Sequence, residues 1–220
     1  MVKLPFRDRT EAGRLLAAEL VRRKLPANVI VLALPRGGVP VGFEIAKALH
    51  APLDVVVVRK VGVPWQPELA MGAIAGQSAG VLNQDLISQL RISQEEIDTA
   101  LAKEKAEVER REELYRRGRP PLKLRGHTAL LVDDGLATGS TMLVAARYAR
   151  TLKPAKTMIA VPVASIEASE SLKKEVDDFV CLATPPSFFA VGEWYMDFRQ
   201  VNDAEVQRLF EESRLNAVTA

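Results

Sequence analysis

Short apolar runs alternate with longer segments of helical periodicity along most of the chain. The apolar runs contain β-prone residues and have no polar face, as is typical of strands covered on both faces of a parallel sheet. They span residues 29–34, 54–58, 128–132, 156–164 and 179–183. The periodic segments predict helices at residues 8–24, 41–50, 140–152 and 165–176. Because a strand, a helix and a second strand in this order form a βαβ unit, we predict an α/β fold with a doubly wound, mostly parallel sheet.

A highly charged segment interrupts this alternation in the middle of the chain. Between Ser93 and Gly118, Glu and Arg alternate around a thin apolar stripe, and Ser93 and Glu96 have the spacing of a capping box. We therefore predict one long helix over residues 93–117, mostly exposed and packed along one edge, within a helical insertion at residues 83–118. The alternatives are a partner surface, a dimer contact or a nucleic-acid surface, although the even alternation of charge argues against a surface that follows phosphates.

Composition and charge narrow the class of protein. The chain has 220 residues, 48% of them hydrophobic, and a formal net charge of +2, so we expect residues 1–220 to form a single globular domain. Its one cysteine, Cys181, lies in an apolar run and is expected to be a core residue rather than a nucleophile. The two histidines lie far apart, which argues against a zinc site. Since the sequence has neither an apolar signal segment nor an apolar run of membrane-spanning length, we expect a cytoplasmic protein.

The stretch from Thr128 to Thr141 carries the clearest chemical signal. Its apolar strand ends at Asp133 and Asp134, and a turn rich in Gly, Thr and Ser leads into the next helix. This order directs backbone N–H groups and the positive end of a helix dipole to one point, which suits an anion. The Gly-Lys-Ser/Thr of a P-loop and the glycine spacing of a dinucleotide site are both missing here. A phosphate close to two hydroxyl groups, as in a ribose 5-phosphate, would satisfy both the turn and the two acids.

The segment VDDGLATGST, residues 132–141, resembles the phosphoribosyl-pyrophosphate (PRPP) binding loop of the type I phosphoribosyltransferases. The resemblance implies that Asp133 and Asp134 hold the ribose hydroxyls, support positive charge on the ribose, and take part in a metal site indirectly, through ribose or water. The residues expected to bind the 5-phosphate are Ala137, Thr138, Gly139, Ser140 and Thr141. A plain helix N-cap is the alternative, but a cap needs one acid or hydroxyl rather than two acids and three hydroxyls.

A second candidate loop runs from Pro35 to Gly38, after the first predicted strand. We expect it at the same edge of the sheet, because ligands of open α/β sheets bind at the carboxyl ends of the strands. Arg36 supplies charge, while Gly37 and Gly38 permit unusual backbone conformations, a close approach to a ligand and amide donors. In the family that the chain resembles, this loop binds pyrophosphate, often through a non-proline cis peptide. A Gly-Gly turn with a surface arginine is the alternative.

Arg59 and Lys60 follow the second predicted strand and are expected to bind pyrophosphate as well. The residues after them are rich in Gly and Pro, which indicates a mobile loop. By resemblance this is the flexible loop of the family. It would close Trp65, Gln66 or Glu68 over the substrate and exclude water, which competes as the nucleophile.

Aromatic residues gather near the end of the chain, at residues 184–202, in a segment that Pro and Gly keep irregular. The resemblance implies that the chain ends and the flexible loop form a small hood, to which this segment belongs. The residues expected to contact a base are Phe188, Phe189, Trp194, Tyr195 and Asp197. Sealing an edge of the core is the alternative role for the aromatic side chains. The segment resembles the 6-oxopurine enzymes, but those carry an aspartate where this chain has Ala137, so Glu68 or Asp197 would have to substitute.

The order of these motifs over most of the chain resembles the bacterial predicted phosphoribosyltransferases of unassigned substrate. The resemblance implies a Mg²⁺-dependent enzyme that displaces pyrophosphate from PRPP with a nitrogen of a small heterocycle, such as a nucleobase. The residues assigned to catalysis are Arg36, Arg59, Lys60, Asp133 and Asp134. We also expect a homodimer, a role in nucleotide salvage, and no membrane or nucleic-acid partner. Two alternatives stay open, namely a non-catalytic regulator that senses PRPP or a nucleotide, and a hydrolase of PRPP or a nucleotide.

Overall fold

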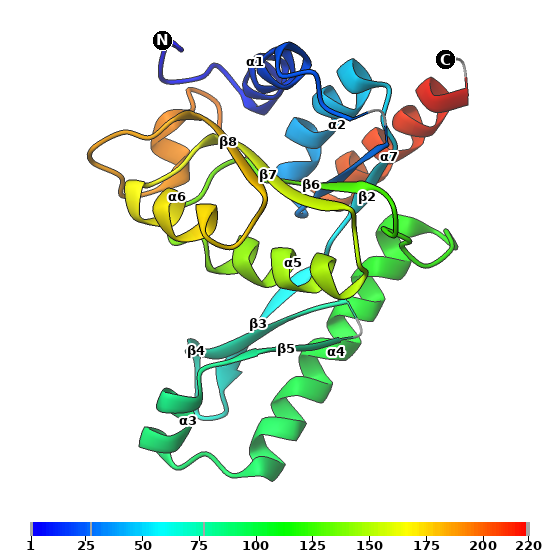
Figure 1. The fold of residues 1–220 in the computed structure, drawn as a ribbon. Helices are drawn as coiled ribbons and strands as arrows, with labels where there is room; N and C mark the ends of the chain where they lie inside the picture. The colour runs from blue at the N-terminus through cyan, green and yellow to red at the C-terminus, as the bar shows by residue number, and fades with distance from the viewer. Residues whose placement is uncertain (1, 27, 77, 219–220) are drawn as a thin grey trace.

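A five-stranded sheet forms the centre of the computed structural model, which describes residues 2–26, 28–76 and 78–218 (Figure 1). Its strands are β1 (Val29–Ala33), β2 (Leu53–Val55), β6 (Thr128–Val132), β7 (Lys156–Val163) and β8 (Asp178–Ala183). They lie in the order β2-β1-β6-β7-β8, and each neighbouring pair is parallel. The predicted parallel sheet is confirmed.

Helices cover both faces of this sheet. They are α1 (Arg9–Arg22), α2 (Gly38–Leu49), α5 (Ser140–Thr151), α6 (Ile166–Lys173) and α7 (Asp203–Val218). Successive residues of a strand point to opposite faces. In β1, Val29, Val31 and Ala33 therefore pack in one core with α1, α2 and α7, while Leu32 packs in a second core with α5 and α6. Figure 1 shows these two groups of helices on opposite sides of the sheet, which is the predicted doubly wound arrangement.

The last helix, α7, lies outside the predicted elements. Asn202 Oδ1 accepts a hydrogen bond from the Glu205 amide at 2.8 Å, as an N-cap does. Val206, Leu209 and Phe210 follow at helical spacing and are buried. The cap and the spacing are both visible in the sequence, although the sequence analysis predicts no element after residue 202.

The chain between β2 and β6 forms a second unit, which projects from the sheet (Figure 1). It consists of the antiparallel strands β3 (Val58–Val63), β4 (Gln66–Ala75) and β5 (Ser78–Leu82), then α3 (Gln84–Leu90) and α4 (Gln94–Arg116). We call residues 58–116 the arm. The helices α3 and α4 lie within the predicted insertion at residues 83–118, and the three strands before them were not predicted as part of it. The strand predicted at residues 54–58 is divided, because β2 ends at Val55 and Val58 pairs with Ala75 in the arm.

The residues after Lys60, which composition predicts as a loop, form most of strands β3 and β4 of the arm. Gly62 lies at a register shift between β3 and β4, where an added Cβ atom would be 2.3 Å from the carbonyl oxygen of Pro67. Val61 and Val63, on either side of it, are buried. The glycine therefore allows two strands to approach closely, which composition alone does not distinguish from a flexible loop.

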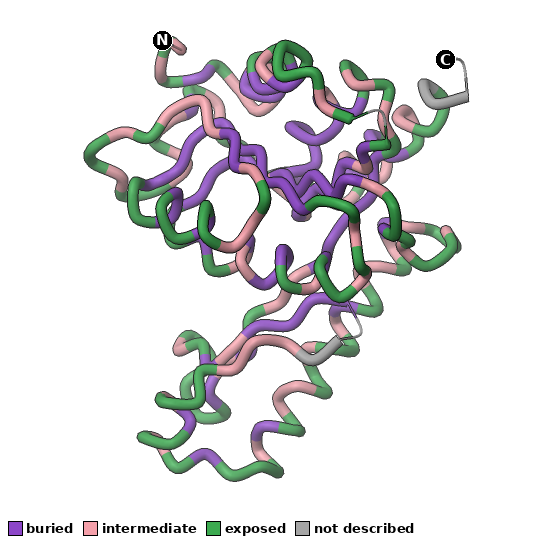
Figure 2. Tube along the Cα trace, viewed as in Figure 1, coloured by how far each residue is buried: buried purple, intermediate pink, exposed green. Residues whose placement is uncertain are grey.

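The long helix α4 confirms the predicted exposed helix and its cap. Glu96 Oε2 accepts from the Ser93 amide at 2.9 Å, and Ser93 Oγ accepts from the Glu96 amide at 3.3 Å. The buried residues of α4 are Ile97, Val108 and Tyr115. Figure 2 shows that most of the helix is exposed or intermediate. At its end, Arg116 makes two hydrogen bonds to the Asp54 carboxylate of β2, at 2.9 and 3.0 Å, which tie the arm to the sheet.

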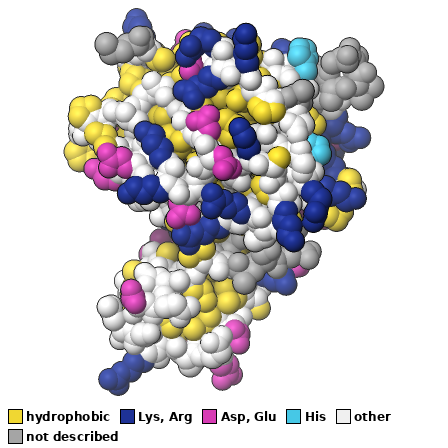
Figure 3. Space-filling model, viewed as in Figure 1, with side chains coloured by type: hydrophobic (Ala, Val, Ile, Leu, Met, Phe, Trp, Pro, Cys, Tyr) yellow, Lys and Arg dark blue, Asp and Glu magenta, His cyan; other side chains and the backbone are white. Residues whose placement is uncertain are grey.

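The surface carries mixed charge. On the face shown in Figure 3, basic and acidic side chains both lie on the part of the protein built around the five-stranded sheet, and a hydrophobic area lies on the arm. In the part of the chain that the structure describes, no helix combines the length and the apolar character needed to cross a membrane.

Candidate active site

The acid loop, residues 133–137, leaves the carboxyl end of β6 and is held from the neighbouring strand. The Leu136 amide donates to the carbonyl oxygen of Val163 at 3.0 Å, and the Leu136 carbonyl oxygen accepts from the Ser165 amide at 2.9 Å. Ser165 Oγ donates to the carbonyl oxygen of Ala137 at 2.7 Å. These bonds fix the loop beside the end of β7, so its acids have defined positions.

The two acids of the loop have different environments. Asp134 is buried, and its Oδ2 accepts from Arg9 Nε at 2.8 Å. Asp133 is half-buried, and its Oδ1 accepts from the Asp134 amide at 2.9 Å. Asp134 therefore has a cationic partner, whereas Asp133 is the more accessible acid.

Arg9 is a site residue that the sequence motifs do not indicate. Its Nη1 donates to the carbonyl oxygen of Arg199 at 2.8 Å, and its Cζ lies 3.9 Å from the centroid of the Phe198 ring. Arg9 begins α1, where a basic side chain is unfavourable because the helix dipole is positive at that end. This unfavourable placement is the signal by which the sequence could have revealed it.

Burial raises the pKa of both acids. For Asp133 desolvation is the largest cause, and repulsion by the neighbouring Asp134 charge adds to it. For Asp134 desolvation is again the largest cause, and the Arg9 cation opposes it. Adjacent carboxylates with raised pKa values are typical of functional sites rather than of surface loops.

Replacing Asp133 by asparagine is expected to stabilise the protein at neutral pH. Because the folded pKa is raised, the folded protein binds more protons than the unfolded chain between the unfolded and folded pKa values, and its stability falls as the pH rises through that window. At pH values above this window, the melting temperature of Asp133→Asn should exceed that of the wild type by about 2–4 °C for each kcal/mol gained in the free energy of unfolding. At pH values below the window, the two melting temperatures should be equal.

The control for this substitution is Asp197→Asn, which removes a more accessible carboxylate. Hydrogen bonds from Arg199 lower the Asp197 pKa, so its loss should bring no gain in melting temperature. An equal or lower melting temperature of Asp133→Asn at neutral pH would contradict the raised pKa of Asp133.

Residues 35–38, here called the cis loop, lie directly against the acid loop. The Pro35–Arg36 peptide bond is cis, as the resemblance implies. A Cβ atom on Gly37 would lie 2.1 Å from Asp134 Oδ2. A Cβ atom on Gly38 would lie 2.6 Å from the carbonyl oxygen of Val132. The end of β1 and the end of β6 thus meet at one edge, as the parallel sheet predicts.

The backbone of the two glycines in the cis loop differs from the prediction, while their binding of pyrophosphate stays a prediction. Gly37 has φ −59° and ψ −36°, which any residue can adopt. Gly38 is the first residue of α2, and its amide donates to the carbonyl oxygen of Leu34 at 3.0 Å. The glycines are therefore required for space beside the acids. The predictions of an unusual backbone at Gly37 and of a free amide donor at Gly38 are wrong.

Arg36 lies near the start of α7. Its Nη1 is 3.8 Å from Asp203 Oδ1, which also accepts from the Tyr115 hydroxyl at 2.6 Å. Burial and this hydrogen bond raise the pKa of Tyr115 to about 12, so the hydroxyl stays a donor. A single carboxylate thus connects the cis loop to the end of α4.

The turn before α5, residues 137–141, has the form of an anion cup. Gly139 has φ +73°, a left-handed conformation that favours glycine. Thr138 and Ser140 are exposed, and their hydroxyl oxygens lie 3.1 Å apart. The first amides of a helix have no partner within the helix, so this turn offers N–H and O–H donors together with the positive end of the α5 dipole. The binding of a phosphate there stays a prediction.

Arg59 and Lys60 point to opposite sides of the arm sheet, because they are successive residues of β3. Arg59 Nε contacts Glu104 Oε2 of α4 at 2.9 Å. Lys60 lies on the other side, in a groove of about 420 Å³ that Ser140 and Thr141 also line. The structure therefore brings Lys60 to the anion cup and holds Arg59 against α4.

The predicted flexible-loop residues lie at the turn between β3 and β4 and at the start of β4. Trp65 is 57% exposed, and Gln66 and Glu68 are exposed too. The neighbouring Pro64 and Pro67 line a groove with the first turns of α4, at the far end of the arm (Figure 1). The closing of these residues over the site stays a prediction.

The aromatic segment seals an edge of the core more than it opens to a ligand. Phe188 packs on Trp194 with ring centroids 5.9 Å apart, and Tyr195 packs on Phe6 at 5.5 Å. The Tyr195 hydroxyl donates to the carbonyl oxygen of Asp134 at 2.5 Å, and burial raises the pKa of Tyr195. Phe189 is 83% exposed. Of the predicted base contacts, Tyr195 reaches the acid loop, where it holds the backbone.

Asp197 and the N-terminal segment complete this region. The carboxylate of Asp197 accepts from Arg199 Nε at 2.9 and 3.0 Å. The Phe6 amide donates to the carbonyl oxygen of Trp194 at 2.8 Å, and the Met196 amide donates to that of Phe6 at 2.7 Å. The N-terminal segment and residues 194–196 therefore pair with each other, and the Tyr195 hydroxyl joins them to the acid loop.

Cys181 is a structural residue. Its Sγ donates to the carbonyl oxygen of Ala183 at 3.1 Å, and burial raises the pKa of the thiol to about 11. A thiol with such a pKa is protonated at neutral pH and is a weak nucleophile.

Comparison with known proteins identifies the class to which this fold and site belong. A family model described as "Phosphoribosyl transferase domain" matches residues 8–198. The chain therefore belongs to the phosphoribosyl transferase domain family.

Two relatives come from strains of Mycobacterium tuberculosis. They are named "Putative phosphoribosyl transferase MT0597" (strain CDC 1551 / Oshkosh) and "Putative phosphoribosyl transferase Rv0571c" (strain ATCC 25618 / H37Rv). Each is 48% identical over 201 residues, which are 91% of this chain and 45% of the relative. The chain thus spans less than half the length of these relatives.

Solved structures support the same fold. The crystal structure of TT1426 from Thermus thermophilus is similar with a TM-score of 0.81 and 41% identity, covering 95% of this chain and 99% of that one. A hypoxanthine phosphoribosyltransferase from Staphylococcus aureus has a TM-score of 0.50 at 10% identity, covering 84% of this chain and 79% of that one. The second likeness concerns the fold alone. The sheet has the arrangement of the type I phosphoribosyltransferases.

Proposed function

We propose that the protein is a Mg²⁺-dependent phosphoribosyltransferase that displaces pyrophosphate from PRPP with a nitrogen of a nucleobase or similar heterocycle. The observation that carries this proposal is the contact between the cis loop and the acid loop, where a Cβ atom on Gly37 would meet Asp134 Oδ2. This contact places the acids, Arg36 and the anion cup at the ends of β1 and β6. PRPP offers a group to each of them: its hydroxyls to the acids, its pyrophosphate to Arg36 and its 5-phosphate to the anion cup.

The reaction requires stabilisation of two opposite charges. The leaving pyrophosphate becomes more negative, and Arg36, with its long contact to Asp203, is free to exchange that partner for a phosphate oxygen. Lys60 lies beside the cup and adds a second cation there. The ribose becomes positive at the transition state, and the carboxylates of Asp133 and Asp134 support it while they accept from its hydroxyls. Arg59 takes part once its contact with Glu104 is released.

The acids fit a Mg²⁺ ion that arrives with the substrate. Among the residues that the structure describes, no group of three or more His, Cys, Asp and Glu side chains forms a cage for a metal. Mg²⁺ usually keeps several waters and binds one or two carboxylates together with substrate phosphates. Asp133 and Asp134 would hold it through water or ribose hydroxyls, and when bound it would neutralise charge on the pyrophosphate.

The acceptor site is proposed at the hood, where the N-terminal segment pairs with residues 194–196. Residue 137 is alanine, so a proton acceptor for the incoming nitrogen would come from Asp197, or from Glu68 after the predicted flexible-loop residues close over the site. Phe189, with its exposed ring, is the aromatic residue of residues 184–202 most open to a planar ligand. A homodimer, a cytoplasmic location and a role in nucleotide salvage are further parts of this proposal.

A pyrophosphate-release screen tests the proposed function. Purified protein, Mg²⁺ and PRPP are combined with a panel of purines, pyrimidines and small heterocyclic amides, and released pyrophosphate is measured. We expect release that depends on one acceptor or one class of acceptors. Release without any acceptor would indicate a hydrolase instead, and PRPP binding without release for every acceptor would indicate a regulator.

A further inference from the structure

One guanidinium group joins three parts of the candidate site. Arg9 begins α1, binds Asp134 of the acid loop through Nε, and binds the carbonyl oxygen of Arg199 through Nη1. The flat face of its guanidinium lies over the Phe198 ring, with 3.9 Å between Cζ and the ring centroid. A planar, multidentate group is needed for all three contacts, and arginine supplies it where lysine does not.

The contact between Arg9 and Asp134 differs from the surface ion pairs of the protein. The side chains are 11% and 12% exposed, so solvent screens the pair weakly. Elsewhere on α1, Arg14 pairs with Glu44 at 3.1 Å, but the Arg14 side chain is 63% exposed. Removing Arg9 would leave the Asp134 charge buried without its cation, which is costly.

The same oxygen of Asp134 is fixed from two sides. Oδ2 accepts from Arg9 Nε at 2.8 Å, and it occupies the space that a Cβ atom on Gly37 would need. The Arg9 guanidinium and the bare Cα of Gly37 together set the orientation of the carboxylate. The second oxygen, Oδ1, is the one that Arg9 does not bind, and it also lies beside the cis loop, 3.2 Å from where a Cβ atom on Gly37 would be.

We propose that Arg9 is a positioning residue for ribose binding, which acts by holding Asp134 Oδ2 against Gly37 so that Oδ1 meets a ribose hydroxyl. The proposal rests on the proposed function, because it requires that the acid loop binds a ribose. Arg9 itself does not touch the substrate. Its contact with the Arg199 carbonyl oxygen also joins residues 184–202 to the acid loop, so the same side chain positions the ribose site and the hood.

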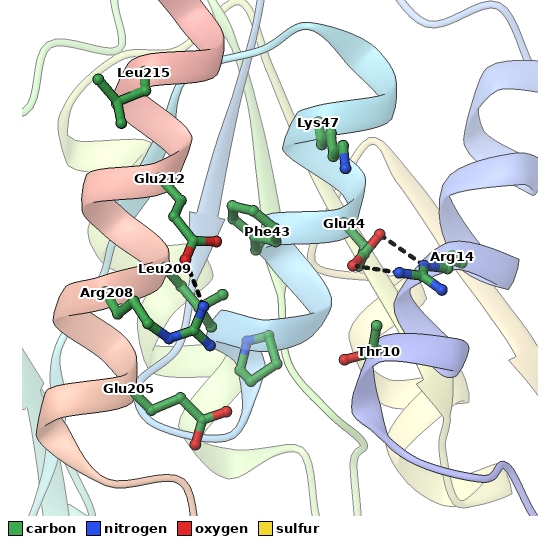
Figure 4. Close-up of a pocket in the computed structure, with 11 residues that line it drawn as sticks. Thr10, Arg14, Phe43, Glu44, Lys47, Glu205, Arg208, Leu209, Glu212 and Leu215 are labelled. Carbon is green, nitrogen blue, oxygen red and sulfur yellow. Dashed lines mark hydrogen bonds and ion pairs between the residues drawn. The ribbon is translucent and has the colours of Figure 1, made fainter.

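The test compares three variants by calorimetric titration with two probes, ribose 5-phosphate and inorganic pyrophosphate with Mg²⁺. Arg9→Gln removes the cation, Arg9→Lys keeps it without the planar group, and Arg14→Gln removes an ion pair of the same helix outside the site. Figure 4 shows Arg14 directed at Glu44 on α2, in a groove of about 440 Å³ between α1, α2 and α7. Arg14→Gln is therefore a matched control for loss of an α1 ion pair.

We expect Arg9→Gln to weaken the binding of ribose 5-phosphate by about 10- to 150-fold, the effect of one hydrogen bond to a charged group. Pyrophosphate binding should change by about twofold at most, as for a substitution away from the bound group. Arg9→Lys should recover part of the ribose 5-phosphate affinity, and Arg14→Gln should leave both affinities unchanged. If Arg9 had only a structural role, its loss would affect the binding of ribose 5-phosphate and of pyrophosphate equally.

Two results would overturn the proposal while the proposed function stands. In the first, Arg9→Gln weakens the binding of both probes equally. In the second, Arg9→Gln binds ribose 5-phosphate with the same affinity as Arg14→Gln. If Arg9→Gln gives no cooperative thermal transition, Arg9→Lys decides by the same comparison, and an unchanged ribose 5-phosphate affinity overturns the proposal. If the wild type binds neither probe, the proposed function fails and the role of Arg9 fails with it.

Discussion

Replacing Gly37 by alanine is expected to weaken the binding of PRPP with Mg²⁺ by about 10- to 150-fold, the effect of one hydrogen bond to a charged group. The added Cβ atom would lie 2.1 Å from Asp134 Oδ2, a distance that no real contact permits, so the carboxylate must move. Once displaced, it no longer meets the ribose hydroxyl. Calorimetric titration of the wild type and Gly37→Ala with PRPP and Mg²⁺ measures this loss.

A double-mutant cycle with Asp134→Ala separates this effect from a general change in the cis loop. In the Asp134→Ala background the new methyl group has no carboxylate to displace, so Gly37→Ala should then have little further effect on PRPP binding. If Gly37→Ala weakens binding equally in both backgrounds, the glycine does not act through Asp134.

Replacing Gly139 by alanine is expected to reduce both stability and the binding of ribose 5-phosphate. Its left-handed conformation, φ +73°, costs a residue with a Cβ atom about 1–2 kcal/mol, and the added atom would lie 3.0 Å from Leu172 Cδ1 and 3.3 Å from Ala168 Cβ. Because α6 is packed behind the turn, the anion cup must shift away from it. Loss of one charge-assisted hydrogen bond would weaken ribose 5-phosphate binding by about 10- to 150-fold.

Gly118 provides the matched control for Gly139. It has φ +72°, and an added Cβ atom would have no other heavy atom within 4 Å. Gly118→Ala should therefore show the conformational cost in thermal denaturation without a change in ribose 5-phosphate affinity. Equal affinities of the two variants would show that Gly139 has no special role in the cup.

Local signals were sufficient for the main sheet and for α4. The strands of the sheet are apolar on both faces, and Ser93 with Glu96 marks the start of α4, so neither prediction required knowledge of distant contacts. The strands of the arm were not predicted, because Gly62 and the prolines near it indicate a loop by composition. At Gly62 the structure uses the missing side chain to bring β3 and β4 together. Composition cannot separate these two uses of glycine.

The candidate site also has parts that the sequence predicts and parts that it does not. Asp133, Asp134 and the anion cup are contiguous in the sequence, and the ends of parallel strands bring the cis loop to them. Arg9 lies 125 positions from Asp134, and no local pattern encodes their contact. The resemblance implies a base contact for Tyr195, and the structure shows that its hydroxyl holds the backbone of the acid loop. Burial decides between these roles of an aromatic side chain, and burial is a property of the fold.

If the acid loop binds the ribose of PRPP, removing the charge of both acids must abolish that binding. The most direct measurement is calorimetric titration of the wild type and of the double variant Asp133→Asn with Asp134→Asn, using PRPP and Mg²⁺, with thermal denaturation to show that both are folded. We expect binding to the wild type and none to the folded double variant. Equal affinities for the two proteins, or no binding to the wild type, would contradict the claim.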